Sequence, residues 1–177
     1  MQRRYFLQQL SALALGWLGL SSCTRSDTAN ATPAQGSAVV AKLNKPLSEW
    51  QKLLPPQAYA VLFEEDTERP RSSSLNDEKR VGTFVCVACY LPLFESKAKF
   101  DSGTGWPSFF QPIPDHIEKK TDYKLIYPRT EYHCARCGGH QGHVFNDGPP
   151  PTGQRWCNNG VALNFIPEGE PLPTLRT

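Results

Sequence analysis

The stretches Thr83-Phe-Val-Cys86-Val-Ala-Cys89 and Glu131-Tyr-His-Cys134-Ala-Arg-Cys137 each carry two cysteines separated by two residues. The two cysteine pairs are 44 residues apart in the chain (90–133). Each pair follows a short run with the composition of a strand, so each should lie at a turn that leaves a strand. Together they supply four thiolates, the tetrahedral ligand set that a structural Zn²⁺ ion prefers.

The alternative for these cysteines is two disulfide bonds, which an oxidising compartment would permit. Disulfides between cysteines so close in sequence are more typical of catalytic than of structural sites. A small β-domain is better stabilised by a closed four-cysteine metal site. We therefore predict one structural Zn²⁺ ion bound by Cys86, Cys89, Cys134 and Cys137.

Around the cysteine pairs, short apolar or alternating runs are separated by Gly, Pro, Asn and Asp. This punctuation predicts a mainly β, antiparallel domain with long functional loops. The 16 prolines argue against long helices. The strand-like runs are residues 82–87, 123–127, 130–134, 143–145 and 161–166.

Two short helices are expected before the strands. Ser48 and Gln51 have the spacing of a capping box, which predicts a helix over 49–54 that the following prolines stop. A further helical turn or two is expected over 56–63, with Pro56 at the first position. Residues 71–79 have the composition of a polar loop.

The beginning of the chain has the features of an export signal. Arg3-Arg4 precede an apolar stretch (10–20) that is too short for a hydrocarbon core, which needs about 20 residues. A positive start, a short apolar middle and small residues at the end are typical of a signal peptide, and we favour this over a buried helix. Arg3-Arg4-Tyr-Phe-Leu7 resembles a twin-arginine address, and Leu20-Ser-Ser-Cys23 resembles a lipobox whose cysteine is acylated. Ordinary cleavage after Ala29-Asn-Ala31 is the alternative.

These features define four segments: a signal peptide (1–22), a flexible tether (23–45), a folded domain (46–168) and a C-terminal tail (169–177). Removing residues 1–22 removes two arginines and no acidic residue, which leaves 17 basic and 17 acidic residues. This balance predicts no nucleic-acid partner. We expect a periplasm-facing, membrane-anchored lipoprotein of a bacterium, acting as a monomer. Because twin-arginine transport carries folded cargo, the metal would be bound before the protein meets oxidants.

One cysteine, Cys157, has neither a pair nor a lipid. An unpaired cysteine in a protein meant for an oxidising space usually has a purpose. Arg155 lies two residues away, on the same face if this segment is a strand, and a cation there would favour the thiolate. A buried, inert thiol is the alternative, and the local sequence does not decide between them.

Three further segments carry a family resemblance together with the two cysteine pairs. They are Phe100-Asp-Ser-Gly-Thr-Gly-Trp-Pro-Ser-Phe109, Gly139-His-Gln-Gly-His-Val-Phe-Asn-Asp-Gly148 and Pro151-Thr-Gly-Gln-Arg-Trp-Cys-Asn-Asn159. In order and spacing they closely resemble the B-type (R-specific) methionine sulfoxide reductases, over about residues 46–168. The resemblance implies a β-tent fold, in which two antiparallel sheets meet over a zinc knuckle. It also implies repair of oxidised proteins under oxidative stress.

The resemblance implies a role for each matching residue. Cys157 would attack the sulfoxide sulfur and be left as a sulfenic acid, which thiols can reduce. His143 would donate the proton that the departing oxygen needs, with His140 positioning the substrate or a water molecule. The remaining expected site residues are Trp106 as the wall for the substrate methyl group, Phe109 at the substrate, Asn159 in the polar network, Arg155 for the thiolate, and Asp147 supporting the histidines. His116 and His133 match no motif and are expected to be surface or linking residues.

The chain departs from the family pattern at three places. Thr104 stands where many members have a resolving cysteine, so we predict an external reductant, either a thioredoxin-like protein or a small thiol. Gln141 and Asn158 each replace an apolar residue beside the site. A non-catalytic binding module and a disulfide oxidoreductase using one cysteine pair are the rival functions. Cys157 with the two histidines argues against the first, and zinc on both pairs against the second. The substrate is either free methionine-R-sulfoxide or the same group in proteins, and we favour proteins.

Overall fold

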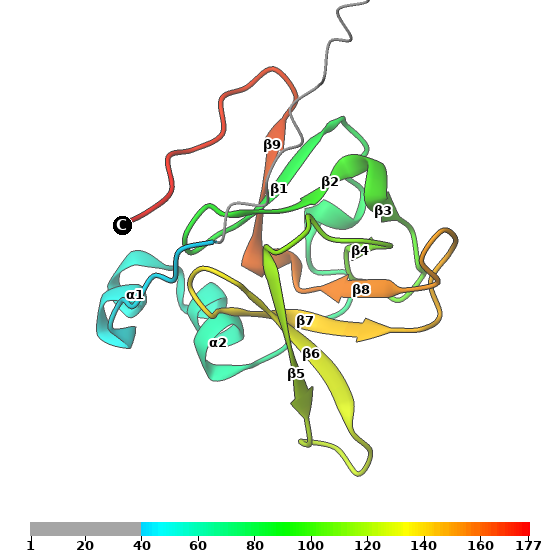
Figure 1. Cartoon of the computed structure of the whole chain (residues 1–177), viewed down its shortest axis with the longest axis horizontal. Helices are drawn as coiled ribbons and strands as arrows, with labels where there is room; N and C mark the ends of the chain where they lie inside the picture. Colours follow the sequence, from blue (N-terminus) through cyan, green and yellow to red (C-terminus); the bar gives the residue numbers. More distant parts are fainter. Residues whose placement is uncertain (1–39) are drawn as a thin grey trace, which may run out of the picture. The chain divides into compact units, whose positions relative to one another are not determined.

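The computed structural model describes residues 40–177, in which two antiparallel sheets and two short helices form one domain (Figure 1). A three-stranded sheet has the order β2-β1-β9, and a six-stranded sheet has the order β3-β4-β8-β7-β6-β5. The mainly β fold with two antiparallel sheets is thus confirmed. The expected signal peptide, the lipobox at Cys23 and most of the tether lie outside the described residues. The strands are β1 (Gly82–Cys86), β2 (Pro92–Glu95), β3 (Lys99–Phe100), β4 (Ser108–Phe109), β5 (Ile117–Asp122), β6 (Arg129–Cys134), β7 (His140–Phe145), β8 (Arg155–Asn158) and β9 (Leu163–Pro167).

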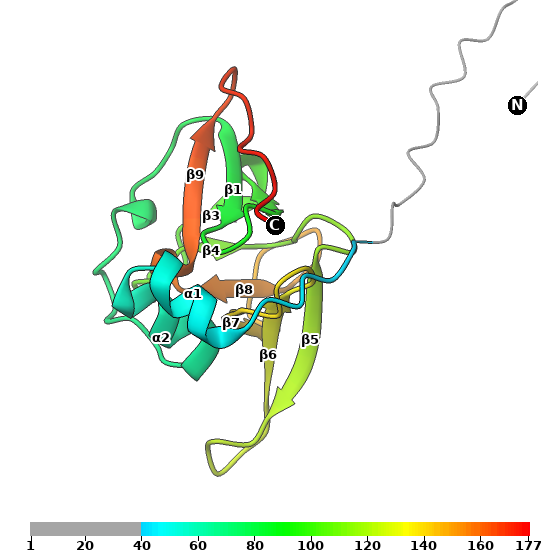
Figure 2. The same cartoon turned by 90° about the vertical axis from the view of Figure 1, so that its left-hand side faces the viewer.

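The helices α1 (Leu47–Leu53) and α2 (Pro56–Glu64) lie together beside the sheets, as Figure 2 shows. The predicted capping box is wrong: α1 begins after Pro46, and no side chain caps it. Pro56 does occupy the first turn of α2, where its missing N–H costs nothing. Among residues 40–177, no helix has the length and apolar character needed to cross a membrane.

An aromatic core joins the two sheets. Phe109 of β4 stacks on Phe94 of β2, with ring centroids 4.2 Å apart, and meets Phe84 of β1 edge-on at 5.0 Å. Tyr132 of β6 continues the contact to Trp156 of β8 at 5.1 Å. Burial of such large rings contributes the apolar area that a domain of this size needs.

The strand prediction was right for β1, β6, β7 and β9 apart from their ends, and wrong at residues 123–127. These residues form the loop that joins β5 to β6, at the end of the long hairpin in Figure 1. Their apolar side chains resemble a strand, but Tyr123, Ile126 and Tyr127 are exposed. The sequence did not indicate β5, because Ile117–Asp122 is mostly polar and its four central residues are exposed.

Both ends of the described chain contact the cysteine knuckle that contains Arg136. Leu43 N–H donates to the Arg136 carbonyl at 2.7 Å, and Arg136 donates to the carbonyl oxygens of Ala41 and Arg176. Residues 40–45 were assigned to the tether from the sequence, and Val40 and Leu43 pack against the core. The contacts of the domain therefore begin before Pro46.

Candidate active site and metal centre

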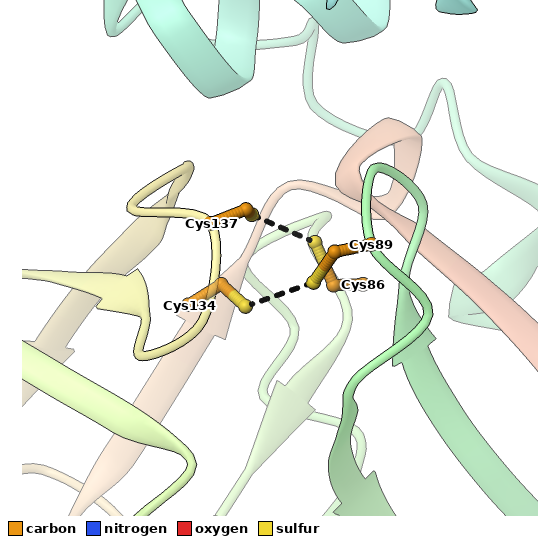
Figure 3. A group of neighbouring side chains, drawn as sticks. All are labelled: Cys86, Cys89, Cys134 and Cys137. Carbon is orange, nitrogen blue, oxygen red and sulfur yellow. Dashed lines mark hydrogen bonds between the residues drawn. The ribbon is translucent and has the colours of Figure 1, made fainter. Parts of the chain in front are cut away.

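The four paired cysteines form one compact sulfur cluster (Figure 3). Sγ of Cys86 lies 3.7 Å from Sγ of Cys137, and Sγ of Cys89 lies 3.5 Å from Sγ of Cys134. All four cysteines are free in the structure, and these two separations are far longer than a disulfide bond of about 2.05 Å. A tetrahedral ion with Zn–S bonds of about 2.3 Å places its sulfurs about 3.8 Å apart. The donor set and its spacing therefore fit a four-coordinate metal ion.

The two knuckles have matching backbone geometry. Tyr90 N–H donates to the Cys86 carbonyl and Gly138 N–H donates to the Cys134 carbonyl, both at 2.9 Å. Tyr90 and Gly138 follow the second cysteine of their pairs with φ of 64° and 73°. The left-handed residue turns the chain away after the second sulfur. Each CxxC pair can therefore present both of its sulfurs to the same point.

A separate small pocket, with a volume of about 160 Å³, contains the fifth described cysteine, Cys157. Strand β8 lies between β4 and β7, so Cys157 has Ser108 on one side and His143 on the other in the sheet register. Residues directly opposite in a sheet point to the same face, which places the thiol and the imidazole together. The pocket is lined by Thr67, Trp106, Arg129, Gly142, His143, Phe145, Cys157, Asn158 and Asn159.

Gly142 permits the close approach of β7 to β8. A Cβ atom at this position would lie 2.0 Å from the Cys157 carbonyl oxygen. Any side chain there would force β7 away from β8. The glycine between the two histidines therefore allows His143 to reach Cys157.

His143 is supported by an aspartate that the sequence did not indicate. Its Nε2 lies 2.8 Å from Oδ2 of Asp122, and Arg129 also binds that carboxylate. Burial lowers the pKa of His143, and the Asp122 carboxylate, which raises it, offsets this only in part. The expected role of Asp147 is therefore corrected. Asp147 makes a bidentate ion pair with Arg155 at 2.9 Å, because its position in the loop after β7 brings it back beside β8.

The thiol of Cys157 is less acidic than its neighbour Arg155 led us to expect. Burial raises the pKa of Cys157, while the Arg155 guanidinium and the Thr104 hydroxyl lower it without fully offsetting burial. The effect of the Thr104 hydroxyl on this pKa shows that the position at which the family resemblance implies a resolving cysteine lies beside Cys157. The Ser102 hydroxyl forms hydrogen bonds with the hydroxyls of Thr104 and Ser108, with oxygen–oxygen distances of 2.8 and 2.7 Å.

Four expected site residues do not line the pocket: Asp147 and Arg155, which pair with one another, and His140 and Phe109. His140 is 2% exposed and lies beside Glu131 and His133, and burial is the main cause that lowers its pKa to about 4. Its ring centroid is 5.4 Å from that of His143. Phe109, expected at the substrate, is fully buried in the aromatic core. It follows Ser108, which shares a face with Cys157, so its side chain points to the opposite face of the strand.

Hydrogen bonds of Asn159 and Glu68 fix the side of the pocket that carries Trp106. Asn159 accepts from Glu68 N–H at 3.1 Å and donates to the Gln141 carbonyl at 3.0 Å. The buried Glu68 carboxylate accepts from the backbone N–H groups of Gly160 and Val161. The Glu68 carbonyl accepts from Trp106 Nε1 at 3.2 Å, which orients the tryptophan over the pocket. Sequence reasoning missed Glu68 because it precedes every recognisable motif.

Gln141 and Asn158, the two polar departures, contact one another. Asn158 Nδ2 donates to Gln141 Oε1 at 3.4 Å, and Tyr132 O–H donates to Asn158 Oδ1 at 2.8 Å. Gln141 Nε2 in turn donates to Cys86 Sγ at 3.4 Å. All three side chains are fully buried. This polar bridge (Gln141, Asn158 and Tyr132) therefore joins the sulfur cluster to the strand that carries Cys157.

A half-buried thiol opposite an imidazole, on a β-domain in which two CxxC knuckles meet, is typical of thiol-dependent enzymes. Comparison with known proteins identifies the family. Residues 54–167 match the SelR domain. The chain is 53% identical to a peptide methionine sulfoxide reductase MsrB of Pseudomonas putida over 129 residues, which cover 71% of this chain and 96% of the relative. A protein of the same name from Methanosarcina barkeri is 49% identical, over 72% of this chain and 91% of the relative. The chain therefore belongs to the family of B-type peptide methionine sulfoxide reductases.

Proposed function

We propose that the protein reduces the R epimer of methionine sulfoxide to methionine, with Cys157 as the nucleophile. The observation that carries the proposal is the shared pocket of Cys157 and His143 beneath Trp106. The apolar ring provides a wall for the substrate methyl group, and the imidazole faces the space that the sulfoxide oxygen would occupy. Family membership supports the same reaction.

The pocket supplies the one proton that the reaction needs. The raised pKa of Cys157 and the lowered pKa of His143 keep the thiol protonated and the imidazole neutral in the free enzyme. We propose that the thiol proton passes to His143 as Cys157 attacks the sulfoxide sulfur, and then to the departing oxygen. The oxygen ends on Cys157 as a sulfenic acid, and methionine is released. Asp122 stabilises the imidazolium that forms in between.

We propose that an external thiol completes the cycle, because the described residues offer Cys157 no cysteine outside the sulfur cluster. One thiol condenses with the sulfenic acid, giving a mixed disulfide and water, and a second thiol releases Cys157. When the reduced protein is given one equivalent of substrate and dimedone without a reductant, mass spectrometry should find a dimedone adduct on Cys157. Thr104→Cys should give an internal disulfide instead. An internal disulfide in the wild-type protein after this treatment would contradict the proposal.

We propose that the sulfur cluster binds one structural Zn²⁺ ion through Cys86, Cys89, Cys134 and Cys137. The ion would cross-link two distant knuckles and would take no part in the redox step. Purified protein should carry one zinc ion that resists mild chelators. Its removal should unfold the domain as measured by circular dichroism, and a fully folded metal-free protein would argue against a structural ion.

Protein-bound methionine sulfoxide is the proposed substrate. Tyr123, Ile126 and Tyr127 are exposed on a loop whose flanking residues, Asp122 and Arg129, belong to the site. An apolar surface at the pocket rim fits an unfolded segment of an oxidised protein. A free amino acid would not need such a surface.

Export and lipid anchoring remain proposals that rest on residues 1–23. Replacing Arg3 and Arg4 with lysine should retain the protein in the cytosol. Cys23→Ser should release it from the membrane while the export signal stays intact. Normal export of the first variant would refute a twin-arginine route.

The decisive experiment compares R- and S-sulfoxides with the wild-type protein and Cys157→Ser. Turnover should be confined to the R epimer and lost in the variant. The variant should retain its tightly held zinc, which separates loss of chemistry from loss of fold. Residual repair by a folded Cys157→Ser protein would refute the assignment, and binding without turnover by the wild type would favour a binding module.

A further inference from the structure

A second cluster of metal-ligating side chains lies beside the active site and apart from the four cysteines. Glu131 and His133 of β6 and His140 of β7 bring one carboxylate and two imidazoles together, with a possible ligand atom of each within 4.8 Å of the others. His133 and His140 are opposite one another in the sheet register. Two histidines and one carboxylate form a ligand set that binds Zn²⁺ and leaves a fourth position open.

The histidine nitrogens that face this cluster lack hydrogen-bond partners. His133 Nε2 and His140 Nδ1 are both buried and unpartnered. His140 Nδ1 approaches Glu131 Oε2 to 3.1 Å, but without the geometry of a hydrogen bond. His140 and the Glu131 side chain are only 2% and 3% exposed. An unsatisfied buried polar atom costs about 1–3 kcal/mol, so a bound cation would relieve two such costs.

The tautomer of His133 also suits a metal. Its Nδ1 lies 3.0 Å from the Gly138 carbonyl oxygen, which can only accept, so Nδ1 carries the proton. Nε2 is then free to act as a ligand, and it lies 3.5 Å from Glu131 Oε1. Metal-binding histidines are commonly oriented in this way by a carbonyl on the far nitrogen.

We propose that Glu131, His133 and His140 form a second, exchangeable site for a divalent transition-metal ion, with Zn²⁺ as the ligand we would test. In the absence of metal, the ammonium of Lys120 lies 3.1 Å from Glu131 Oε1. Lys120 is 61% exposed on a flexible side chain, so it can leave when an ion binds. The site is distinct from the sulfur cluster, because it has no thiolate.

The position of this site predicts an effect on the proposed reaction. The His140 and His143 rings are 5.4 Å apart. A divalent charge on His140 would oppose protonation of His143, which the proposed proton transfer requires. Zinc binding should therefore inhibit the enzyme, and this consequence alone rests on the proposed function.

Metal stoichiometry tests the site without reference to activity. The full chain is equilibrated with buffered micromolar free Zn²⁺, and bound zinc is measured by mass spectrometry of the metal. The wild type should hold two ions, one of which mild chelation removes. His133→Ala should lose at least about tenfold in affinity for the second ion and retain the first. Lys120→Met should bind the second ion more tightly. His116→Ala, a histidine outside both clusters, should behave as the wild type.

Two outcomes would overturn the proposal. One is a single zinc ion per wild-type chain, and the other is two ions in His133→Ala. Cobalt substitution provides a spectroscopic check, since an ion on nitrogen and oxygen ligands lacks the thiolate charge-transfer band. Zinc inhibition that persists in His133→Ala would assign the inhibitory ion to Cys157 and His143 instead.

Discussion

Replacing Asn158 with leucine restores an apolar residue of similar size and leaves two buried groups without a partner. Tyr132 O–H loses its acceptor at 2.8 Å, and Gln141 Oε1 loses its donor at 3.4 Å. Burial raises the pKa of Tyr132 well above its ordinary value, so this hydroxyl keeps its proton and still needs an acceptor. At about 1–3 kcal/mol for each of the two orphaned groups, Asn158→Leu should destabilise the domain by about 2–6 kcal/mol.

The second mutation should cost less once the first is present. Gln141→Leu alone removes a donor to Cys86 Sγ and a partner of Asn158, but Asn158 Nδ2 still donates to the Asn159 carbonyl at 2.8 Å. In the double variant the orphaned Gln141 oxygen is gone, so the combined loss should fall short of the sum by about 1–2 kcal/mol. Adding Tyr132→Phe should recover more stability, because an all-apolar replacement leaves no unpaired group.

The assay is urea unfolding followed by tryptophan fluorescence at one fixed free zinc concentration. The midpoints are comparable where the slopes are equal, since an altered slope signals a changed denatured or native state. Additivity of the two single changes to within about 0.5 kcal/mol would refute the coupling. A cost below about 0.5 kcal/mol for Asn158→Leu would refute the reasoning about its buried partners.

Three other outcomes follow from the site. The Arg155 guanidinium lowers the pKa of the Cys157 thiol, which burial raises. Arg155→Met should therefore shift the pH dependence of alkylation of Cys157 by iodoacetamide to higher pH. An unchanged pH dependence would contradict this. The Asp122 carboxylate raises the pKa of His143, so Asp122→Asn should lower that pKa. The pH optimum of kcat should then shift to lower pH. A shift to higher pH would argue against His143 as the proton carrier. Ile126→Ser should raise KM for an oxidised protein several-fold and leave KM for free methionine sulfoxide unchanged; Leu175→Ser, an exposed apolar residue near the C-terminus, is the matched control.

The cluster of four cysteines could be predicted because it depends on the local spacing of each CxxC pair. Each CxxC pair needs one turn to align its sulfurs, and Cys86 and Cys134 each end a strand. Cys157 was singled out by the family resemblance of its motif, because the local sequence alone did not decide between a nucleophile and an inert thiol; the structure places it in β8. In such cases the residues that make the site are neighbours in the chain as well as in space.

The supporting residues could not be predicted because tertiary contacts bring them to the site. Asp122 is 21 residues from His143, and Glu68 is 92 residues from Gly160. Phe109 was assigned to the substrate because it lies in a site motif, and the alternation of the strand sends it to the core. The hairpin loop over 123–127 has the composition of a strand, and only the structure shows that its side chains are exposed.

The position of Cys157 in an inner strand has a consequence for the order of events. With β4 on one side and β7 on the other, its backbone is held by both neighbouring strands. In the proposed reaction the oxidised sulfur therefore stays in the pocket, and the reductant has to reach it through the opening that methionine leaves. The sulfoxide substrate and the electron donor should then bind in turn at the same opening and compete for it, giving ping-pong kinetics in which an excess of either partner slows the cycle.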